Sequence, residues 1–387
     1  MITFDEVTKS YPGARGGEPT IAVDNLSLEA PTGQITVLVG PSGCGKTTSL
    51  RMVNRMTDPT SGTLAIDGQD IMSTDAATLR RGIGYVIQHA GLFPHRAVVD
   101  NVATVPLLLG WSKDKARRRA REVLELVGLP GAYADRYPAQ LSGGQQQRVG
   151  VARALAADPP VMLMDEPFSA VDPVVRDQLQ DEFLRLQDEL GKTIIFVTHD
   201  IDEAIKMGDQ VAVLRVGGVL AQVATPEYLL AHPIDDFVAD FVGRDRGYRS
   251  LSFQPAPQLP LREEVVVPLG AESDAVRAAT SDPWVLVVDD EARPQGWVEP
   301  QRIQAPIEPS MLHRGGTVAR ADGPLRAMLD AALSSPSRRG VVVDDKGRLL
   351  GTVRAHEVLA AIEAADRPEV DPDDVAPTEA VAGDAAR

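Results

Sequence analysis

The chain has 387 residues, of which 43% are hydrophobic and 24% charged, which are ordinary globular proportions in a length that suits about two domains. Its formal net charge of −16 argues against binding to nucleic acid, and its single cysteine, Cys44, excludes internal disulfides and cysteine-based zinc sites. No apolar run approaches the roughly 18 residues that span a bilayer, and the N-terminus has no signal-peptide pattern, so we expect a cytosolic protein that acts at a membrane only through a partner.

The first predicted strands, at 2–8 and 21–30, alternate apolar and polar residues as an antiparallel sheet does. Tyr11 lies between them. It either packs as an ordinary core or loop residue or stacks on the flat face of an adenine ring. The motif that comes next in the chain favours stacking.

Residues 40–47 match the pattern G-x-x-x-x-G-K-[ST], between a β-branched strand at 34–39 and a helix-compatible segment at 47–55. A Gly-rich turn in this context aims backbone N–H groups at phosphate oxygens. Lys46 is expected to reach the β- and γ-phosphates of ATP, and Thr47 to bind Mg²⁺ through its hydroxyl. The predicted ATP-binding residues of this loop are Gly40, Pro41, Ser42, Gly43, Cys44, Gly45, Lys46, Thr47 and Thr48.

Beyond the loop, residues 63–66 and the turn Asp67-Gly68 predict a hairpin, and residues 83–87 predict a buried strand that ends at Gln88. The amide oxygen of Gln88 is expected to meet Mg²⁺ and the attacking water. The alternative is that Gln88 has no catalytic role and is simply the polar residue at which the strand emerges from the core. From 98 to 128 the pattern is helical, and the basic face within 114–127 is interpreted as a solvated surface.

Residues 141–145 read Leu-Ser-Gly-Gly-Gln and precede a helical segment at 146–157. Ser142 suits a helix N-cap, and the paired glycines let an anion approach the backbone. One nucleotide does not need two such cradles from one subunit, so this motif is expected to close on the nucleotide of a second copy in a head-to-tail dimer. The residues assigned to that contact are Ser142, Gly143, Gly144 and Gln145.

The apolar strand at 161–164 is followed by Asp165 and Glu166. Asp165 suits Mg²⁺ binding together with Thr47, and Glu166 suits the acceptance of a proton from the attacking water. The alternative is that the two carboxylates only cap the next helix.

A further β-branched strand at 193–197 leads to His199, which is either structural or contacts the γ-phosphate at the nucleotide edge of a parallel sheet. Strands at 210–216 and 219–223, and helices within 225–241, are expected to close the domain.

The order of these motifs, with Ser-Ala-Val-Asp at 169–172, resembles an ABC-transporter ATPase over about residues 1–240. The resemblance implies an α/β fold: a P-loop ABC ATPase domain with a mixed sheet core plus antiparallel β and helical subdomains. It also implies two subunits around two ATP molecules, with transmembrane permease subunits as partners that face the segment from Gln88 to about Val105. In roles, it implies Glu166 as the catalytic base, His199 as the γ-phosphate switch and Tyr11 as the adenine-stacking ring, and adds Asp172 to the nucleotide-binding residues.

A narrower resemblance is to the quaternary-amine (glycine betaine, carnitine, choline) osmoprotectant importers. It implies an extracytoplasmic solute-binding protein and a peripheral location at the cytoplasmic face of the plasma membrane. The alternatives are an importer of another small solute, a soluble ABC ATPase of DNA repair or translation, and a regulatory adaptor. The stretches that carry the resemblance lie at 51–62, 84–95, 101–106 and 110–111.

The C-terminal third is expected to form a second, smaller α/β domain. Residues 284–298 and 340–353 repeat a strand, an Asp-rich turn and a second strand, with helices at about 324–334 and 355–363. This is similar to a pair of CBS motifs, with a degenerate first copy that lacks a helix pattern after Val298. Such a module binds a nucleotide, senses ionic strength, or only dimerises. The expected boundaries are 1–242 for the ATPase, 243–262 for a linker, 263–363 for the CBS-like domain and 364–387 for a disordered acidic tail.

Overall fold

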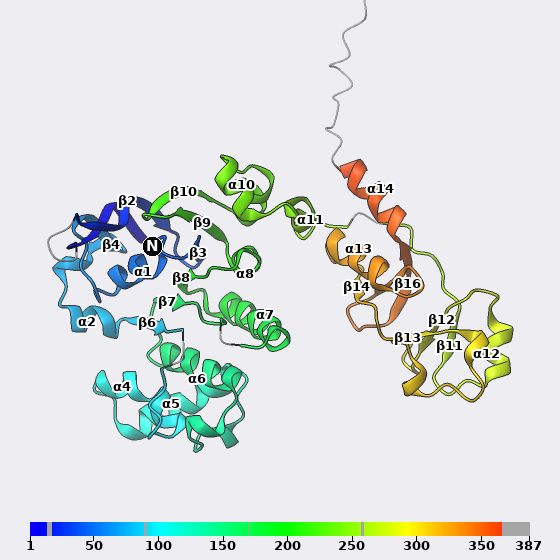
Figure 1. Ribbon diagram of the computed structural model, residues 1–387. Coiled ribbons are helices and arrows are strands. Elements are labelled where there is room, and N and C mark those ends of the chain that lie inside the picture. The colour runs from blue at the N-terminus through cyan, green and yellow to red at the C-terminus, as the bar shows by residue number, and fades with distance from the viewer. Residues whose placement is uncertain (14–17, 89–90, 170, 257–258, 366–387) are drawn as a thin grey trace, which may run out of the picture. The chain divides into compact units, whose positions relative to one another are not determined.

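The computed structural model describes residues 1–13, 18–88, 91–169, 171–256 and 259–365. The chain forms two compact units, Met1–Arg246 and Gly247–Arg387 (Figure 1). Within the described residues, no helix has the length and apolar character needed to cross a membrane.

A six-stranded sheet in the order β10-β9-β3-β8-β7-β6 forms the centre of the first unit. All its pairs are parallel except β9 with β10, which form an antiparallel hairpin. Every residue of β3, β7 and β8 is buried, which explains their unbroken apolar runs. The strands are β3 (Ile35–Val39), β6 (Ile83–Val86), β7 (Val161–Asp165), β8 (Thr193–Val197), β9 (Gln210–Arg215) and β10 (Val219–Ala224).

A second, antiparallel sheet in the order β2-β1-β4-β5 shares its core with the first. Helix α1 (Lys46–Val53) packs against β2, β7 and β8, so it lies between the two sheets. Phe4, Leu50 and Leu163 are each at most 2% exposed and join the sheets and the helix in one core. The strands of this sheet are β1 (Ile2–Tyr11), β2 (Thr20–Ala30), β4 (Ser61–Ile66) and β5 (Gln69–Asp70).

A helical region is inserted between β6 and β7, as the sequence predicts (Figure 1). The basic face of α5 is ion-paired: Arg117 with Asp100 at 3.2 Å and Arg121 with Asp135 at 3.1 Å. This agrees with a solvated helix face. The helices are α3 (Val98–Val102), α4 (Thr104–Leu108), α5 (Lys113–Leu126) and α6 (Gly143–Leu155), and α2 (Ala76–Arg81) precedes β6.

Of the helices that follow β7 and β8, α8 packs against β3 and α9 packs against β9 and β10. Helix α7 starts at Pro173 with Asp172 as its N-cap, and α8 starts after Asp200. The fold therefore matches the predicted mixed sheet with antiparallel and helical additions. The helices of the first unit are α7 (Pro173–Leu190), α8 (Ile201–Met207), α9 (Pro226–Ala231) and α10 (Asp236–Val242), and α11 (Arg246–Ser250) starts at the boundary and belongs mostly to the second unit.

The second unit contains the same supersecondary motif twice. In each copy a short strand pairs in parallel with a second strand, which returns as an antiparallel hairpin. Both predicted strand–turn–strand repeats are present. As expected, the first copy lacks an α-helix after Val298, where only the 3-10 turns Pro300–Arg302 and Pro309–Met311 precede β14. The elements are β11 (Val266–Pro268), α12 (Ser273–Ala279), β12 (Val285–Val288), β13 (Pro294–Val298), β14 (Val318–Arg320), α13 (Leu325–Ser334), β15 (Arg339–Val343), β16 (Leu349–Arg354) and α14 (Ala355–Ala365).

The stretch 243–262, expected from the sequence to be a linker, is in large part packed. It contains α11, and Leu251 is only 6% exposed, in one core cluster with Leu325 and Val353. Its Pro, Arg and Gly content suggested a linker, but Leu251 is buried in the second unit, and Tyr248, Leu259 and Leu261 are partly buried against the same core cluster. The predicted disordered tail, apart from residues 364–365 in α14, lies outside the described residues.

Candidate nucleotide site

The phosphate loop connects the buried strand β3 to α1, as its sequence context predicts. Gly45 has a φ of 90°, and a Cβ added there would lie 2.2 Å from the carbonyl oxygen of Ala22. Only glycine fits a left-handed backbone that passes so close to a neighbouring strand. The loop therefore holds its shape through contact with β2, in addition to its own hydrogen bonds.

A cavity of about 450 Å³ lies over this loop. Glu166 and His199, which follow the ends of β7 and β8, also line it. Lys46 is 7% exposed, and its Nζ donates to the carbonyl oxygens of Gly40 at 2.6 Å and Pro41 at 3.1 Å. An ammonium and a turn of backbone N–H groups at one cavity form an anion-binding surface. The other lining residues are Ala22, Ser42, Gly43, Cys44, Gly45, Thr47 and Thr48.

Thr47, which lines this cavity, contacts Asp165 at the end of β7. Thr47 Oγ1 donates to Asp165 Oδ1 at 3.0 Å. Burial raises the pKa of the Asp165 carboxyl, and the hydrogen bond from Thr47 opposes that rise. A hydroxyl oxygen and a carboxylate oxygen in contact beside the phosphate loop are ligands of the kind that Mg²⁺ takes from a protein.

Glu166 is held between two side chains from neighbouring strand ends. Gln88 Nε2 donates to its Oε2 at 3.0 Å, and His199 Nδ1 lies 3.2 Å from its Oε1. The register pairs Asp165 with Val197, so the residues just beyond β7 and β8 emerge side by side. Gln88, Glu166 and His199, predicted separately from three strand ends, are thus brought together.

The backbone at Glu166 is unusual. Its φ is 45°, a left-handed conformation that a non-glycine residue adopts at a cost. Its N–H donates to the Val197 carbonyl at 2.9 Å, and its carbonyl oxygen accepts from Ser169 Oγ at 3.0 Å. These bonds fix the turn that carries the Glu166 carboxylate, which lines the cavity.

The Leu-Ser-Gly-Gly-Gln stretch at 141–145, here called the signature motif, does not line this cavity. Ser142 is the N-cap of α6 and forms a capping box with Gln145: Ser142 Oγ accepts from the Gln145 N–H at 3.4 Å, and Gln145 Oε1 accepts from the Ser142 N–H at 3.0 Å. Ser142 and Gly143 are exposed, and Gly144 is half-buried. The motif is a helix N-terminus open to solvent, away from the chain's own phosphate loop.

Tyr11 and Asp172 also lie outside the cavity lining. Tyr11 is 40% exposed at the end of β1, and Lys9 Nζ lies 5.1 Å from its ring centroid. The Asp172 carboxylate accepts from the Val174 N–H at 3.0 Å as the N-cap of α7. The structure gives both residues exposed positions and brings neither to the phosphate loop.

Sequence reasoning missed two features around the site. Ala22 lines the cavity, but an alanine in a strand carries no chemical signal. Glu203, 8% exposed on α8, accepts from Gln180 Nε2 at 3.0 Å and from the Thr198 side chain, next to His199. An acidic residue in the first turn of a helix is common, so no pattern in the sequence pointed to the burial of Glu203.

Residues 23–169 match the family model described as ABC transporter. The chain is 43% identical to the choline transport ATP-binding protein OpuBA of Bacillus subtilis, over 91% of this chain and 94% of that protein. This chain belongs to the ABC transporter family. It is an ATPase of that family and binds ATP, as its motifs predict.

A second relative matches most of the chain, whereas a solved structure matches only part of it. The osmoprotectant import ATP-binding protein OsmV of Salmonella typhimurium is 42% identical, again over 91% of this chain and 94% of that protein. A solved structure titled as the dimeric structure of MJ0796, a bacterial ABC transporter cassette, is 35% identical with a TM-score of 0.53. It covers 58% of this chain and 99% of its own, so a complete ABC cassette accounts for little more than half of the chain.

Proposed function

We propose that this chain is the ATP-hydrolysing subunit of a binding-protein-dependent importer that takes up glycine betaine or a related quaternary-amine solute. One observation carries the solute class: OpuBA and OsmV, named for choline and osmoprotectant transport, each align over 94% of their own length, so the likeness extends beyond the ATPase unit. The dimeric cassette, by contrast, matches only 58% of the chain.

In this proposal Glu166 is the general base. Its carboxylate lines the cavity beside the phosphate loop, where it can accept a proton from the water that attacks the γ-phosphate. Gln88 and His199 hold its two oxygens, which leaves the carboxylate one orientation. His199 contacts the γ-phosphate from the same position, and Lys46 exchanges its carbonyl partners for phosphate oxygens.

The residues present fit a magnesium ion. Thr47 Oγ1 and Asp165 Oδ1 are 3.0 Å apart, and Gln88 lies at the same edge of the sheet. Among the described residues there is no cluster of three or more His, Cys, Asp or Glu that holds a metal. That suits Mg²⁺, which is usually held by one or two carboxylates together with substrate phosphates and water. When bound, it neutralises charge on the phosphates.

We further propose that the chain works as a homodimer in which the Ser142–Gln145 motif closes on the partner copy's nucleotide. The motif is exposed and lies apart from the chain's own phosphate loop, which supports a contact in trans. The N-terminus of α6 offers the N–H groups and dipole that favour an anion. Tyr11 stacks on adenine, and Asp172 contacts the nucleotide across the same interface.

The proposed partners are permease subunits in the membrane and an extracytoplasmic solute-binding protein, with this chain peripheral on the cytoplasmic side. Leu107, Leu108 and Leu109 near the end of α4 are each about 40–60% exposed. An apolar surface of that kind, close after the segment that follows Gln88, suits a contact with the permease. We assign the second unit, with its two strand–turn–strand repeats, a regulatory role as a CBS-like module.

Reconstitution tests this function. The chain is assembled with its permease in proteoliposomes that hold ATP and Mg²⁺, and uptake of labelled glycine betaine, carnitine and choline is measured with the binding protein present. We expect uptake of at least one quaternary amine, and none with the Glu166→Gln variant. Uptake of an unrelated solute alone would overturn the proposed substrate class and leave the ATPase assignment standing.

A further inference from the structure

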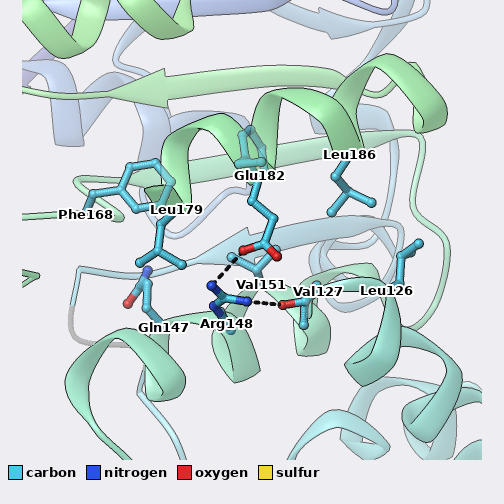
Figure 2. A pocket seen from close by; sticks show the side chains of 10 residues that line it. Leu126, Val127, Gln147, Arg148, Val151, Phe168, Leu179, Glu182 and Leu186 are labelled. Atoms are coloured by element: carbon cyan, nitrogen blue, oxygen red, sulfur yellow. Dashed lines mark hydrogen bonds and ion pairs between the residues drawn. The ribbon is translucent and has the colours of Figure 1, made fainter. Parts of the chain in front are cut away.

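Arg148 joins three helical segments at one point of the first unit. It lies on α6, the helix that begins with the signature motif. Its Nη2 lies 2.7 Å from Glu182 Oε2 on α7, and its Nη1 donates to the carbonyl oxygens of Val127 at 3.1 Å and Gly128 at 3.3 Å, at the end of α5. Figure 2 shows the guanidinium reaching Glu182 on one side and the Val127 carbonyl on the other.

Gly128 makes room for this contact. Its φ is +72°, and an added Cβ would lie 2.3 Å from Arg148 Nη1 and 2.5 Å from Glu182 Oε1. A residue with a side chain at 128 would therefore push the ion pair apart as well as strain the backbone. The absence of a side chain at Gly128, just after α5, thus leaves the space that the Arg148–Glu182 ion pair occupies.

The pair crosses an apolar crevice between α6 and α7 (Figure 2). Leu126, Val151 and Leu186 are among its lining residues, and the side chains of Arg148 and Glu182 are 25% and 32% exposed. The buried Nε2 of Gln147, also at the crevice, has no hydrogen-bond partner. The two helices are therefore incompletely packed here, and directional polar contacts made by Arg148 set their spacing.

We propose that Arg148 is a positioning residue that fixes the signature helix against α7. It lies outside the nucleotide cavity and contacts no reacting group. Through α6 it orients the exposed Ser142 end, and through α7 it is connected to the turn that follows Glu166. This inference rests on the proposed function, since the orientation of the signature motif matters only if that motif binds a partner's nucleotide.

The test uses the full-length Glu166→Gln protein, in which ATP and Mg²⁺ are expected to hold a dimer. Self-association is measured by analytical ultracentrifugation with and without Arg148→Met. Loss of hydrogen bonds to a charged group weakens an interaction by about tenfold or more, so we expect dimerisation roughly tenfold weaker. Binding of a fluorescent ATP analogue to dilute monomer should change less than about twofold, because the chain's own cavity is untouched.

Two further variants separate the ion pair from the carbonyl contacts. Arg148→Lys keeps the charge but has no planar fork, so it cannot contact Glu182 and both carbonyls together, and we expect an intermediate loss. Reversing the pair with Arg148→Glu and Glu182→Arg should not restore dimerisation, because a glutamate at 148 would face the Val127 and Gly128 carbonyls.

Asp181→Asn is the matched control. Asp181 is on α7 beside Glu182, but its ion pair is with Lys206 on α8 at 2.7 Å, outside the crevice. It should leave dimerisation unchanged. If Arg148→Met lowers only the thermal midpoint and dimerises like the Glu166→Gln protein, the positioning role is wrong. If the Arg148→Met variant does not fold, dimerisation of the Glu182→Gln variant is measured instead, and unchanged dimerisation would show that the positioning role is wrong. If the Glu166→Gln protein itself forms no ATP-dependent dimer, the proposed sandwich fails instead.

Discussion

His199 Nδ1 lies 3.2 Å from Glu166 Oε1, across the ends of the adjacent strands β8 and β7. Gln88 approaches the other oxygen of the same carboxylate from the end of β6. Three successive strands of the parallel sheet thus end in three side chains that meet, beside a loop shaped for phosphates.

Glu166→Gln should bind ATP and fail to hydrolyse it. The amide keeps the size of the side chain and loses the proton acceptor, and removal of a positioned general base typically slows a reaction about 100- to 10,000-fold. Phosphate release under saturating ATP and Mg²⁺ measures the turnover, and gel filtration with ATP should show a stable dimer. Turnover near the parental rate would remove Glu166 from the mechanism.

Thr47→Val should raise the concentration of Mg²⁺ needed for half-maximal ATPase activity. The substitution is nearly isosteric but removes the hydroxyl that bonds Asp165 at 3.0 Å. Thr47→Ser keeps the hydroxyl and serves as the matched control, with a requirement close to the parental one. The same Mg²⁺ requirement for valine and parental proteins would show that Thr47 is no ligand.

Glu203→Gln should alter how stability depends on pH. Burial raises the pKa of the Glu203 carboxyl, with opposing hydrogen bonds from Thr198 and Gln180. The folded state then holds a proton that the unfolded state releases above about pH 4.3, so this group's contribution to stability falls as pH rises through that window. The variant lacks this loss. Urea unfolding from pH 4 to 8 should show its stability rising relative to the parental protein as pH increases. A constant difference would contradict the raised pKa.

Removal of the second unit should relieve a restraint on transport. Exposed charged residues of the second unit interact more weakly with nearby charges as salt shortens the Debye length, from about 10 Å at 0.1 M to about 3 Å at 1 M. A chain ending near Gly243 should keep its ATPase activity, since a complete cassette structure matches only 58% of the chain. In permease-containing proteoliposomes it should transport at low ionic strength, where the full chain is restrained. Equal uptake by both chains across a salt series, with and without cytosolic nucleotides, would leave the unit a dimerising appendage.

The chemistry of the site was largely predictable, because phosphate loops and strand-end carboxylates carry their roles in residue type and spacing. Gln88, Glu166 and His199 could each be singled out as strand-end residues. Their mutual contacts could not, because these depend on a register that pairs Asp165 with Val197. Ala22 lines the cavity because β2 passes close to Gly45, and this long-range contact cannot be predicted from the local sequence.

The organisation of the second unit shows where local composition misleads. Pro, Arg and Gly around residues 243–262 suggested a linker, but burial of Leu251 with Leu325 is a long-range contact that composition cannot reveal. The crevice crossed by Arg148 is a similar case. The basic and acidic residues of α6 and α7 look like ordinary surface charge in the sequence, and only the packing of the two helices makes Arg148 and Glu182 partners.

The left-handed turn at Glu166 has a consequence for anyone who engineers this protein. A non-glycine residue held at a φ of 45° stores about 1–3 kcal/mol of strain. Glu166→Gly should therefore raise the free energy of unfolding while abolishing hydrolysis. A selection for thermal robustness alone, blind to transport, would favour a more durable and catalytically silent protein.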